Sequence, residues 1–311
     1  MTQSLTPASS PSLALIGAAI GCGAPDERCA DAPFALRGGG LQDDLRALGV
    51  QADWQAIHLA PRRSDGVEPL AAVGDLSRRL ADDTAALTRA RRRFVGFGGD
   101  HTAAIGLWSG AARGLRSIGA NGEAPGRFGL IWIDAHMDSH TFATTQSRMI
   151  HGMPVACLLG HGDPSLTNIA GPQPALAPEN LCLIGTRSFE AGEAALLARL
   201  GVRVIGIEDV KRIGFAAALD EARAIAAHGT AGYGLSLDVD AFDPAEAPGT
   251  GYWEPNGLHA DDVAPALGAL AADARFVGLE VAEYNPHKDG DGRTARMITR
   301  MVASVAAIGV A

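Results

Sequence analysis

The sequence predicts an α/β protein built around a mostly parallel β-sheet. Short runs rich in Val, Ile, Leu and Phe recur along the chain, and longer stretches with apolar residues at helical spacing separate them. Uninterrupted apolar runs of this length are typical of strands that are buried on both faces. Strands that alternate with helices form βαβ units, in which neighbouring strands run parallel. Aromatic residues make up only 5% of the chain, which suits helices packed closely on a sheet.

The elements follow from these patterns in chain order. The predicted strands cover residues 13–19, 54–59 (the weakest pattern), 94–98, 128–134, 181–185, 202–207, 233–240 and 276–283. The predicted helices cover residues 70–90, 193–200, 215–227, 261–272 and 294–308. Residues 160–180, which include four prolines, are expected to form a surface excursion. Because no repeat or composition break interrupts the pattern, we expect a flexible tail over residues 1–12 and a single domain over residues 13–311.

Composition excludes several classes of protein. The net charge is −9, whereas nucleic-acid binding requires a basic surface. No apolar run approaches the roughly 20 residues that span a membrane. Residues 1–12 contain no Lys or Arg, so they do not resemble a secretory signal. The four cysteines, Cys22, Cys29, Cys157 and Cys182, form no CxxC pair and are expected to be reduced thiols of a cytoplasmic protein.

Polar clusters follow four of the predicted strands. They are Gly99-Asp100-His101-Thr102, the segment from Asp134 to Asp138, Asp238-Val239-Asp240 with Asp243 beyond it, and Glu283-Tyr284-Asn285-Pro286. In parallel sheets, ligands bind beyond the carboxyl ends of the strands. These clusters are therefore expected to meet in one binding site.

The DxHxD and DxD patterns indicate a metal site. Residues two apart on extended chain point to the same side, so Asp134, His136 and Asp138 can converge on one point. Taken singly, each cluster is also compatible with a turn or a helix cap. Together, however, buried carboxylates need a counter-charge. Carboxylates with imidazole and no thiolate favour manganese or a similar cation. The number of ligands suits two ions about 3.5–4 Å apart, which can lower the pKa of a shared water.

The motif set resembles that of the arginase (ureohydrolase) family. The matching segments, in the order of the family, are GGDHT at 98–102, DAHMD at 134–138, IHGMPVACLLG at 150–160, SLDVDAFDPAEAPGTG at 236–251 and EVAEYNP at 280–286. LALIGAAIGCGAPD at 13–26 is similar to the first strand and loop of the family. The resemblance implies a three-layer α/β/α sandwich around an eight-stranded parallel sheet, usually assembled as trimers or hexamers.

The resemblance also implies roles for individual residues. His101, Asp134, Asp138 and Asp238 match the ligands of one manganese ion, and Asp134, His136, Asp238 and Asp240 match those of the other. Asp134 and Asp238 would bridge the two ions. His151 matches a residue proposed as a proton shuttle, and Glu283 matches the carboxylate that pairs with the substrate guanidinium. Asp138 could in addition pass a proton to the leaving amine.

The implied substrate is a guanidino compound, with L-arginine, cleaved to ornithine and urea, as the first expectation. Thr145 and Ser147 resemble residues that bind the α-carboxylate of arginine. His140 and Met149 depart from the Asn usual in arginases, and Glu190 alone remains of an acidic pattern that reads the α-amino group. Tyr252 and Trp253 replace a smaller pair and could reshape the cleft. Agmatine, another ω-guanidino compound such as guanidinobutyrate, and formiminoglutamate therefore stay as alternatives.

Two further alternatives belong to other classes. A deacetylase-like metal hydrolase would share a related fold, but its single zinc with fewer carboxylates does not fit the paired DAHMD and DVD motifs. A binding protein without activity would not be expected to keep every ligand. Each of these alternatives predicts one bound metal ion or none, whereas an arginase-like site is expected to hold two, so the number of bound ions separates them.

Overall fold

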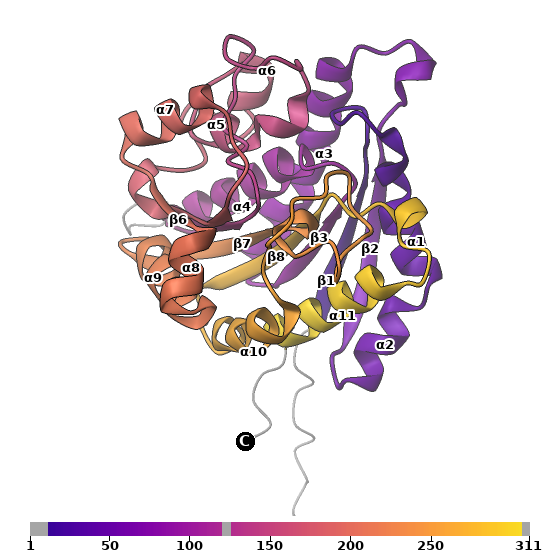
Figure 1. Cartoon of the computed structure of the whole chain (residues 1–311). Helices are drawn as coiled ribbons and strands as arrows, with labels where there is room; N and C mark the ends of the chain where they lie inside the picture. The colour runs from indigo at the N-terminus through magenta and orange to yellow at the C-terminus, as the bar shows by residue number, and fades with distance from the viewer. Residues whose placement is uncertain (1–11, 120–125, 307–311) are drawn as a thin grey trace, which may run out of the picture.

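The fold is a parallel sheet covered by helices on both faces (Figure 1). The computed structural model describes residues 12–119 and 126–306; the tail predicted over residues 1–12 lies, apart from Ser12, outside them. The described strands are β1 (Leu13–Ala19), β2 (Ala52–Leu59), β3 (Phe94–Gly98), β4 (Phe128–Ile133), β5 (Leu181–Thr186), β6 (Arg203–Gly206), β7 (Gly232–Asp238) and β8 (Phe276–Ala282). Every pairing between them is parallel.

The strand order is β2-β1-β3-β8-β7-β4-β5-β6. The last two strands of the chain therefore occupy the centre of the sheet, between β3 and β4. Within β1, Leu13 and Leu15 face one apolar core, while Ala14 and Ile16 face the other. This alternation explains why the buried strands are apolar at every position.

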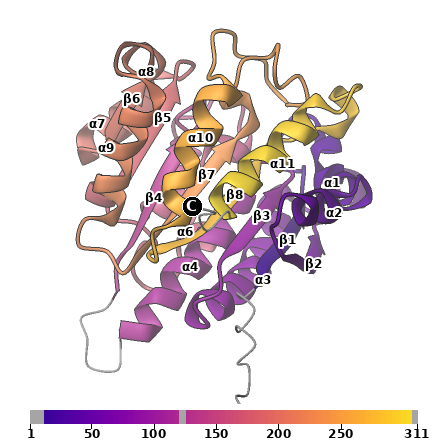
Figure 2. The same ribbon diagram turned by 90° about the horizontal axis from the view of Figure 1, so that it is seen from below.

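The helices form two layers. They are α1 (Ala32–Gly38), α2 (Leu41–Ala47), α3 (Pro69–Arg89), α4 (Ala103–Gly119), α5 (Pro154–Leu158), α6 (Pro164–Thr167), α7 (Ala191–Leu200), α8 (Ile207–Ile213), α9 (Phe215–Ala227), α10 (Ala260–Ala271) and α11 (Arg293–Ala306). Helices α1, α2, α8, α9, α10 and α11 contribute to one core. Helices α3 to α7 contribute to the other. The view from below shows α10 and α11 on the face opposite α3 and α4 (Figure 2).

Four predicted strands run too far at their carboxyl ends, and one of them, predicted over 276–283, ends at Ala282. The strand predicted over 128–134 ends at Ile133, and the one over 233–240 ends at Asp238, where a 3₁₀ turn (Val239–Ala241) begins. The strand predicted over 202–207 ends at Gly206, because Ile207 opens α8. Asp134 and Asp240 thus lie beyond the last residue of their strands. All predicted helices are present, and the ends that the structure describes are shifted by at most two residues. The end predicted at residue 308 lies outside the described residues.

Helix α4 was not predicted, and its glycines explain why. Gly106, Gly110 and Gly114 lower the helix propensity of the segment, but their spacing of four places them on one face of the helix. A β-carbon at Gly110 would lie 2.0 Å from Thr84 Oγ1 of α3. The glycines therefore permit close contact between α3 and α4.

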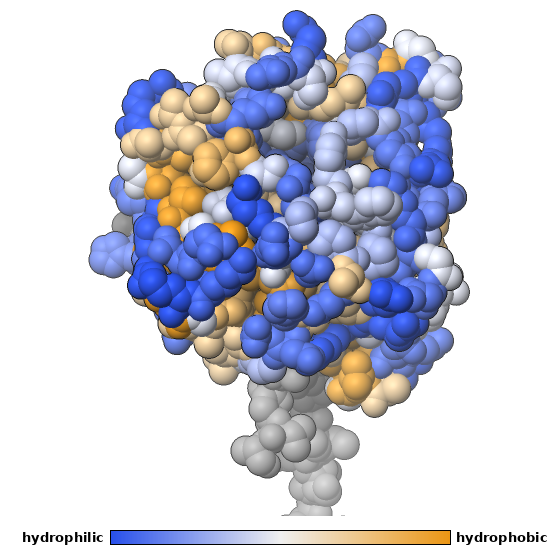
Figure 3. Space-filling view, in the orientation of Figure 1, coloured by the Kyte–Doolittle hydropathy of each residue, from blue (hydrophilic) through white to orange (hydrophobic). Residues whose placement is uncertain are grey.

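The surface view is mostly hydrophilic, with apolar residues gathered toward the upper left, in the region of α7 (Figure 3). Among the described residues, no helix is long and apolar enough to cross a membrane. All four cysteines are buried and free, as the sequence predicted.

Candidate metal centre

Four neighbouring strands of the sheet deliver the polar clusters to one place. His101 follows β3 and Asp134 follows β4, while Asp238 ends β7 and Glu283 comes directly after β8. Since these strands lie side by side in the order β3-β8-β7-β4, their carboxyl ends share one edge. Segments separated by more than a hundred residues thus form a single cluster, as the sequence predicted.

The cluster contains two groups of possible metal ligands that share Asp134. In the first, His101 Nδ1 lies 3.3 Å from Asp134 Oδ2 and 2.9 Å from Asp238 Oδ2. In the second, His136 Nδ1 lies 3.5 Å from Asp134 Oδ1 and 3.1 Å from Asp240 Oδ2. The two oxygens of Asp134 thus face different groups. A carboxylate in this position can bridge two cations.

Asp138 adds a further carboxylate to the first group, and Asp238 faces this group with only one of its two oxygens. Asp138 Oδ2 lies 3.0 Å from His101 Nδ1. Asp238 places Oδ2 in the His101 group, while its Oδ1 accepts a hydrogen bond from the Asp240 backbone amide. The structure therefore shows Asp134 between the groups, whereas the bridging role expected for Asp238 stays a prediction.

The residues fit a pair of cations. His101 Nδ1 is buried and makes no hydrogen bond of good geometry, although three carboxylate oxygens lie within 3.3 Å of it. A ligand atom surrounded by acceptors but bonded to none of them indicates space meant for a cation. Four buried aspartates in one cluster would repel one another without such a charge. The donor set, oxygen and imidazole nitrogen without thiolate, suits a hard or borderline divalent metal.

The electrostatics of the cluster show the same crowding. Burial, together with the charge of Asp134, raises the pKa of Asp138 to about 7. Burial raises the pKa of Asp238 well above its usual range, and the neighbouring Asp240 adds to the effect. For Asp134, burial acts in the same direction, but the neighbouring imidazoles of His101 and His136 outweigh it and lower the pKa. Such opposed shifts arise when like charges share a site without a cation.

Behind His101 lies a buried chain of hydrogen bonds that the sequence reasoning missed. His101 Nε2 lies 2.9 Å from Ser236 Oγ, which donates to Glu280 Oε2 over 2.8 Å. Trp108 Nε1 donates to the same oxygen. This chain orients the imidazole so that Nδ1 faces the aspartates. The available signal was a polar residue inside each of two otherwise apolar runs, Ser236 in β7 and Glu280 in β8.

His151 and Glu283 form an ion pair beside the metal groups. His151 Nδ1 lies 2.9 Å from Glu283 Oε1, and the same oxygen accepts a hydrogen bond from the His101 backbone amide. Burial alone would lower the pKa of His151, but the Glu283 carboxylate outweighs it and raises the pKa to about 9. Burial would likewise raise the pKa of Glu283, and the charge of His151 lowers it instead. Tyr252 stacks on His151 with ring centroids 5.8 Å apart.

Asp100, in the GGDH motif, positions a loop. Its side chain accepts a hydrogen bond from the Gly23 amide over 2.7 Å, and the Gly23 carbonyl accepts one from the His151 amide. The backbone of His151 is thus held by the loop after β1, which in turn is held by the motif after β3.

A cavity of about 300 Å³ extends from the aspartates to a polar head region. His140 Nε2 lies 3.0 Å from Glu190 Oε2 and 3.4 Å from Glu193 Oε2, and Ser147 lines the same cavity. Thr145 does not line it; its hydroxyl lies 3.3 Å from that of Ser147 and accepts a hydrogen bond from the Arg148 amide.

The sequence reasoning missed two acidic residues of this cavity, Glu193 and Glu254. Glu193 is buried at the start of α7 and accepts the Glu190 amide over 2.9 Å. Glu254 lies 3.6 Å from His136 Nε2. The family pattern pointed to Glu190 as the acidic residue of this region, and Glu193 lies three residues beyond it.

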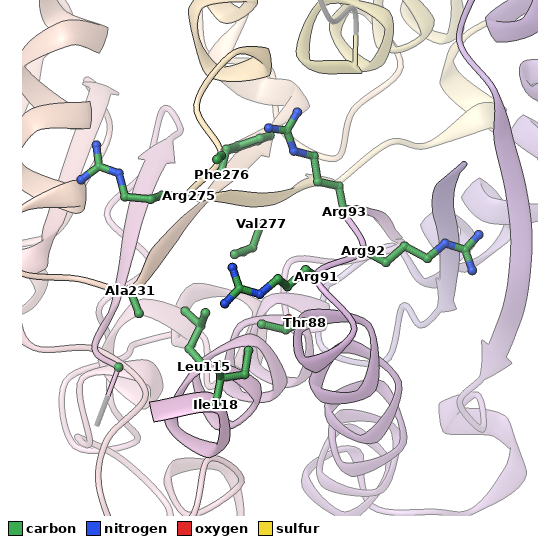
Figure 4. A pocket seen from close by; sticks show the side chains of 12 residues that line it. Thr88, Arg91, Arg92, Arg93, Leu115, Ile118, Ala231, Arg275, Phe276 and Val277 are labelled. Carbon is green, nitrogen blue, oxygen red and sulfur yellow. The ribbon is translucent and has the colours of Figure 1, made fainter. Parts of the chain in front are cut away.

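A separate cavity of about 330 Å³ lies where β3 and β8 begin, at the opposite edge of the sheet. Figure 4 shows the arginines around it, together with Leu115, Ile118, Phe276 and Val277. None of the predicted site residues lines this cavity.

A parallel α/β sheet with two imidazole–carboxylate groups at its carboxyl edge is the architecture of a metal-dependent hydrolase. The sequence profile "Arginase family" matches residues 11–307. The chain is 32% identical to an arginase from Brevibacillus brevis over 94% of its own length and 97% of the relative. It is 33% identical to an arginase from Bacillus caldovelox over 85% of each chain. An arginase structure from Bacillus subtilis superposes with a TM-score of 0.86 at 28% identity, covering 97% of this chain and 100% of the other.

The chain belongs to the arginase family. Members of this family are hydrolases that act on the C–N bonds of guanidino compounds, and they use a binuclear metal centre. The family and the fold expected from the sequence motifs are thus confirmed.

Proposed function

We propose that the protein hydrolyses L-arginine to L-ornithine and urea with two manganese ions. The observation that carries the proposal is the pair of His/Asp groups that share Asp134 and lie beside Glu283. Two cations held there would supply Lewis acidity and would lower the pKa of water enough to provide a nucleophile at neutral pH.

The other steps belong to the side chains. Although burial acts against it, the charge of His151 lowers the pKa of the buried Glu283 carboxyl. This favours the carboxylate form, which would bind the planar guanidinium through charge-assisted hydrogen bonds. His151, paired with Glu283 over 2.9 Å, would give a proton to the departing amine and recover one from solvent. Asp138 can hold the proton on its way from the nucleophile. These roles match those expected from the family resemblance.

The head region supports an amine-bearing substrate. Glu190 and Glu193 offer negative charge to an α-ammonium group, and Ser147 offers a hydroxyl donor to an α-carboxylate. His140, whose Nε2 faces both glutamates, would hold them in place for the substrate. Thr145 would act through Ser147, and Tyr252 would cover the reacting end.

A second candidate substrate is agmatine, which keeps the ammonium group and lacks the carboxylate. The cavity lining includes two glutamates at the head region and no lysine or arginine. The carboxylate of arginine would therefore depend on Ser147, whereas agmatine has no carboxylate to bind.

A urea-release assay on manganese-loaded protein tests the proposal. The panel is arginine, agmatine and guanidinobutyrate, with formamide or ammonia release from formiminoglutamate in parallel. Urea from arginine with the highest kcat/KM supports the proposal. A clear preference for agmatine would move the substrate and keep the chemistry. Fewer than two metals per chain in active protein would contradict the binuclear assignment.

Manganese as the native metal, a trimer or hexamer, and a cytoplasmic location complete the proposal. Metal analysis of protein purified without added metal, sedimentation of the purified protein, and cell fractionation test these three points respectively.

A further inference from the structure

The cavity of about 330 Å³ where β3 and β8 begin has the charge of a site for an anion. Four arginines line it, and among the described residues no acidic side chain does; the arginines are Arg91, Arg92, Arg93 and Arg275. The chain as a whole has a net charge of −9, so this concentration of positive charge departs from its average. Such a local field attracts ligands of the opposite sign. We call this space the arginine-lined cavity.

Three of the four arginines have structural partners. Arg92 donates to the Ser12 carbonyl over 3.0 Å, and Figure 4 shows it pointing away from the cavity. Arg93 donates to two carbonyls at and just beyond the end of α10, each over 2.7 Å. Arg275 forms an ion pair with Asp273 over 3.2 Å. These guanidinium groups hold loops and a helix end in place, which requires no ligand.

Arg91 differs from the other three. Figure 4 shows its guanidinium directed into the cavity. Within residues 12–119 and 126–306, no hydrogen bond or ion pair involves this guanidinium. Its five N–H donors are therefore available to an acceptor that enters the cavity.

The backbone at Arg91 is also unusual. Helix α3 ends two residues earlier, and Arg91 has a φ of 53°. Its amide donates to the Thr88 carbonyl, and the Arg92 amide donates to the Leu87 carbonyl. These two bonds form the Schellman motif, in which the left-handed residue is usually glycine. Arginine retains a backbone strain that glycine would relieve, and the side chain that it adds is the one directed into the cavity.

The remainder of the lining is mostly apolar. Leu115 and Ile118 come from the end of α4, and Phe276 and Val277 come from the start of β8. Ile118 and Val277 are only half-buried, so a ligand would remove further apolar surface from water. The volume lies in the range of small-molecule sites, which combine apolar walls with a few polar anchors. The lining thus suits an anion with an apolar body.

We propose that the arginine-lined cavity binds a small organic carboxylate, with the carboxylate on Arg91 and the apolar body against α4 and β8. A planar guanidinium pairs with a carboxylate through two parallel hydrogen bonds. One available guanidinium matches a single negative charge, which favours a monoanion.

The proposed site is separate from the candidate metal centre. Strands β3 and β8 begin at the arginine-lined cavity, and His101 and Glu283 follow their opposite ends. Strands of five and seven residues span about 16–23 Å. A carboxylate in this cavity and a substrate at the metal centre can therefore bind at the same time, and the inference does not depend on the proposed guanidine hydrolysis.

Calorimetric titration with 2-naphthoate tests the site, and 2-naphthamide and acetate are the comparison ligands. The amide keeps the rings and lacks the charge, while acetate keeps the charge and lacks the rings. We expect a Kd of about 1 mM or lower for 2-naphthoate. Each comparison ligand should bind about tenfold more weakly or worse. Equal affinity for 2-naphthoate and 2-naphthamide would overturn the proposal.

Substitution of Arg91 assigns the binding to this cavity. Arg91→Met keeps an unbranched side chain and removes the charge, so it should raise the Kd for 2-naphthoate about tenfold. Arg91→Lys keeps the charge and should bind more tightly than Arg91→Met. Arg37→Met, at an exposed position on α1, removes the same charge from the whole molecule and should leave the Kd unchanged. Melting temperatures of the variants report on folding.

Two further outcomes would overturn the site. One is the absence of binding to the wild type, or the same Kd in the wild type and in Arg91→Met. The other concerns the metal centre, because a carboxylate can also coordinate a bound metal ion. The titration is therefore repeated after dialysis against a chelator. An unchanged Kd supports the arginine-lined cavity, whereas loss of binding would place the ligand on the metals.

Discussion

Two residues of the site keep backbone conformations that L-amino acids rarely adopt. Asp138 has a φ of 47° and Glu283 a φ of 61°. Such conformations cost about 1–3 kcal/mol and persist where the surrounding structure enforces them. Here the Asp138 carbonyl accepts the Val155 amide, and the Glu283 amide donates to the Gly99 carbonyl, each over 2.9 Å. The strained backbone directs each carboxylate toward the site, whereas a regular backbone conformation would direct it elsewhere.

The shared position of Asp134 leads to a prediction about metal content. Asp240→Asn should remove one ion, because Asp240 belongs to the His136 group alone. Asp134→Asn should impair both sites, because its two oxygens face different groups. Both changes preserve side-chain shape, so elemental analysis of the folded variants compares like with like. Two full metal equivalents in Asp134→Asn would refute the shared ligand.

His151 is predicted to act in turnover and not in metal binding. His151→Asn should lower kcat by about 100-fold or more, the usual loss for a positioned proton donor, with both metals retained. Stopped assays and metal analysis of the same sample measure the two effects. His228→Asn, at an exposed position, is the matched control and should behave as the wild type. Loss of metal from His151→Asn would instead make it a ligand or a fold element.

The residue types in the sequence predicted the metal-ligand cluster better than they predicted the hydrogen-bonded residues that hold this cluster in place. Asp134, His136, Asp238 and Asp240 stand out because charged residues two apart follow apolar strands. Ser236 and Glu280 escaped because their contact depends on the pairing of β7 with β8, in which they lie opposite each other. That register is a tertiary property, and no local pattern encodes it.

At the scale of elements, strands were easier to predict than helices. An apolar strand buried on both faces is visible in composition alone. The short helices α1, α2, α5, α6 and α8 were missed because each has at most seven residues, too few to establish a helical period. Helix α4 was missed because its glycines lower the helix propensity of the segment. Their role is to allow the close approach of α4 to α3.

The surroundings of two helix glycines, Gly110 on α4 and Gly268 on α10, predict opposite effects when each is replaced by alanine. At Gly110 a β-carbon would lie 2.4 Å from the Ala81 carbonyl oxygen of α3, so Gly110→Ala forces the helices apart. We expect a loss of about 1–3 kcal/mol in the free energy of unfolding. Gly268, on α10, has no atom within 4 Å of such a β-carbon. Gly268→Ala should therefore stabilise the protein by about 0.5–1 kcal/mol. Urea unfolding measures both, and equal signs would refute the packing argument.

For the whole molecule, stability should depend on bound metal. Four buried aspartates repel one another in the metal-free protein, and a ligand that binds the folded state alone stabilises it. Free metal at 100 to 1,000 times its dissociation constant contributes about 3–4 kcal/mol per site. Dialysis against a chelator should therefore lower the melting temperature by several degrees, and added Mn²⁺ should restore it. Scanning calorimetry measures the change; an unchanged melting temperature would argue against occupied sites.

The strand order also has a consequence for synthesis. β3 and β4 follow each other in the chain, yet β8 and β7 separate them in the sheet. Until the ribosome has released β7 (Gly232–Asp238) and then β8 (Phe276–Ala282), the strands β2-β1-β3 and β4-β5-β6 lack the partners that join them at the centre of the sheet. Unpaired apolar edges attract other chains, and parallel pairing between distant segments is slow. Because the two central strands arrive last, we expect the incomplete sheet to be prone to aggregation during translation.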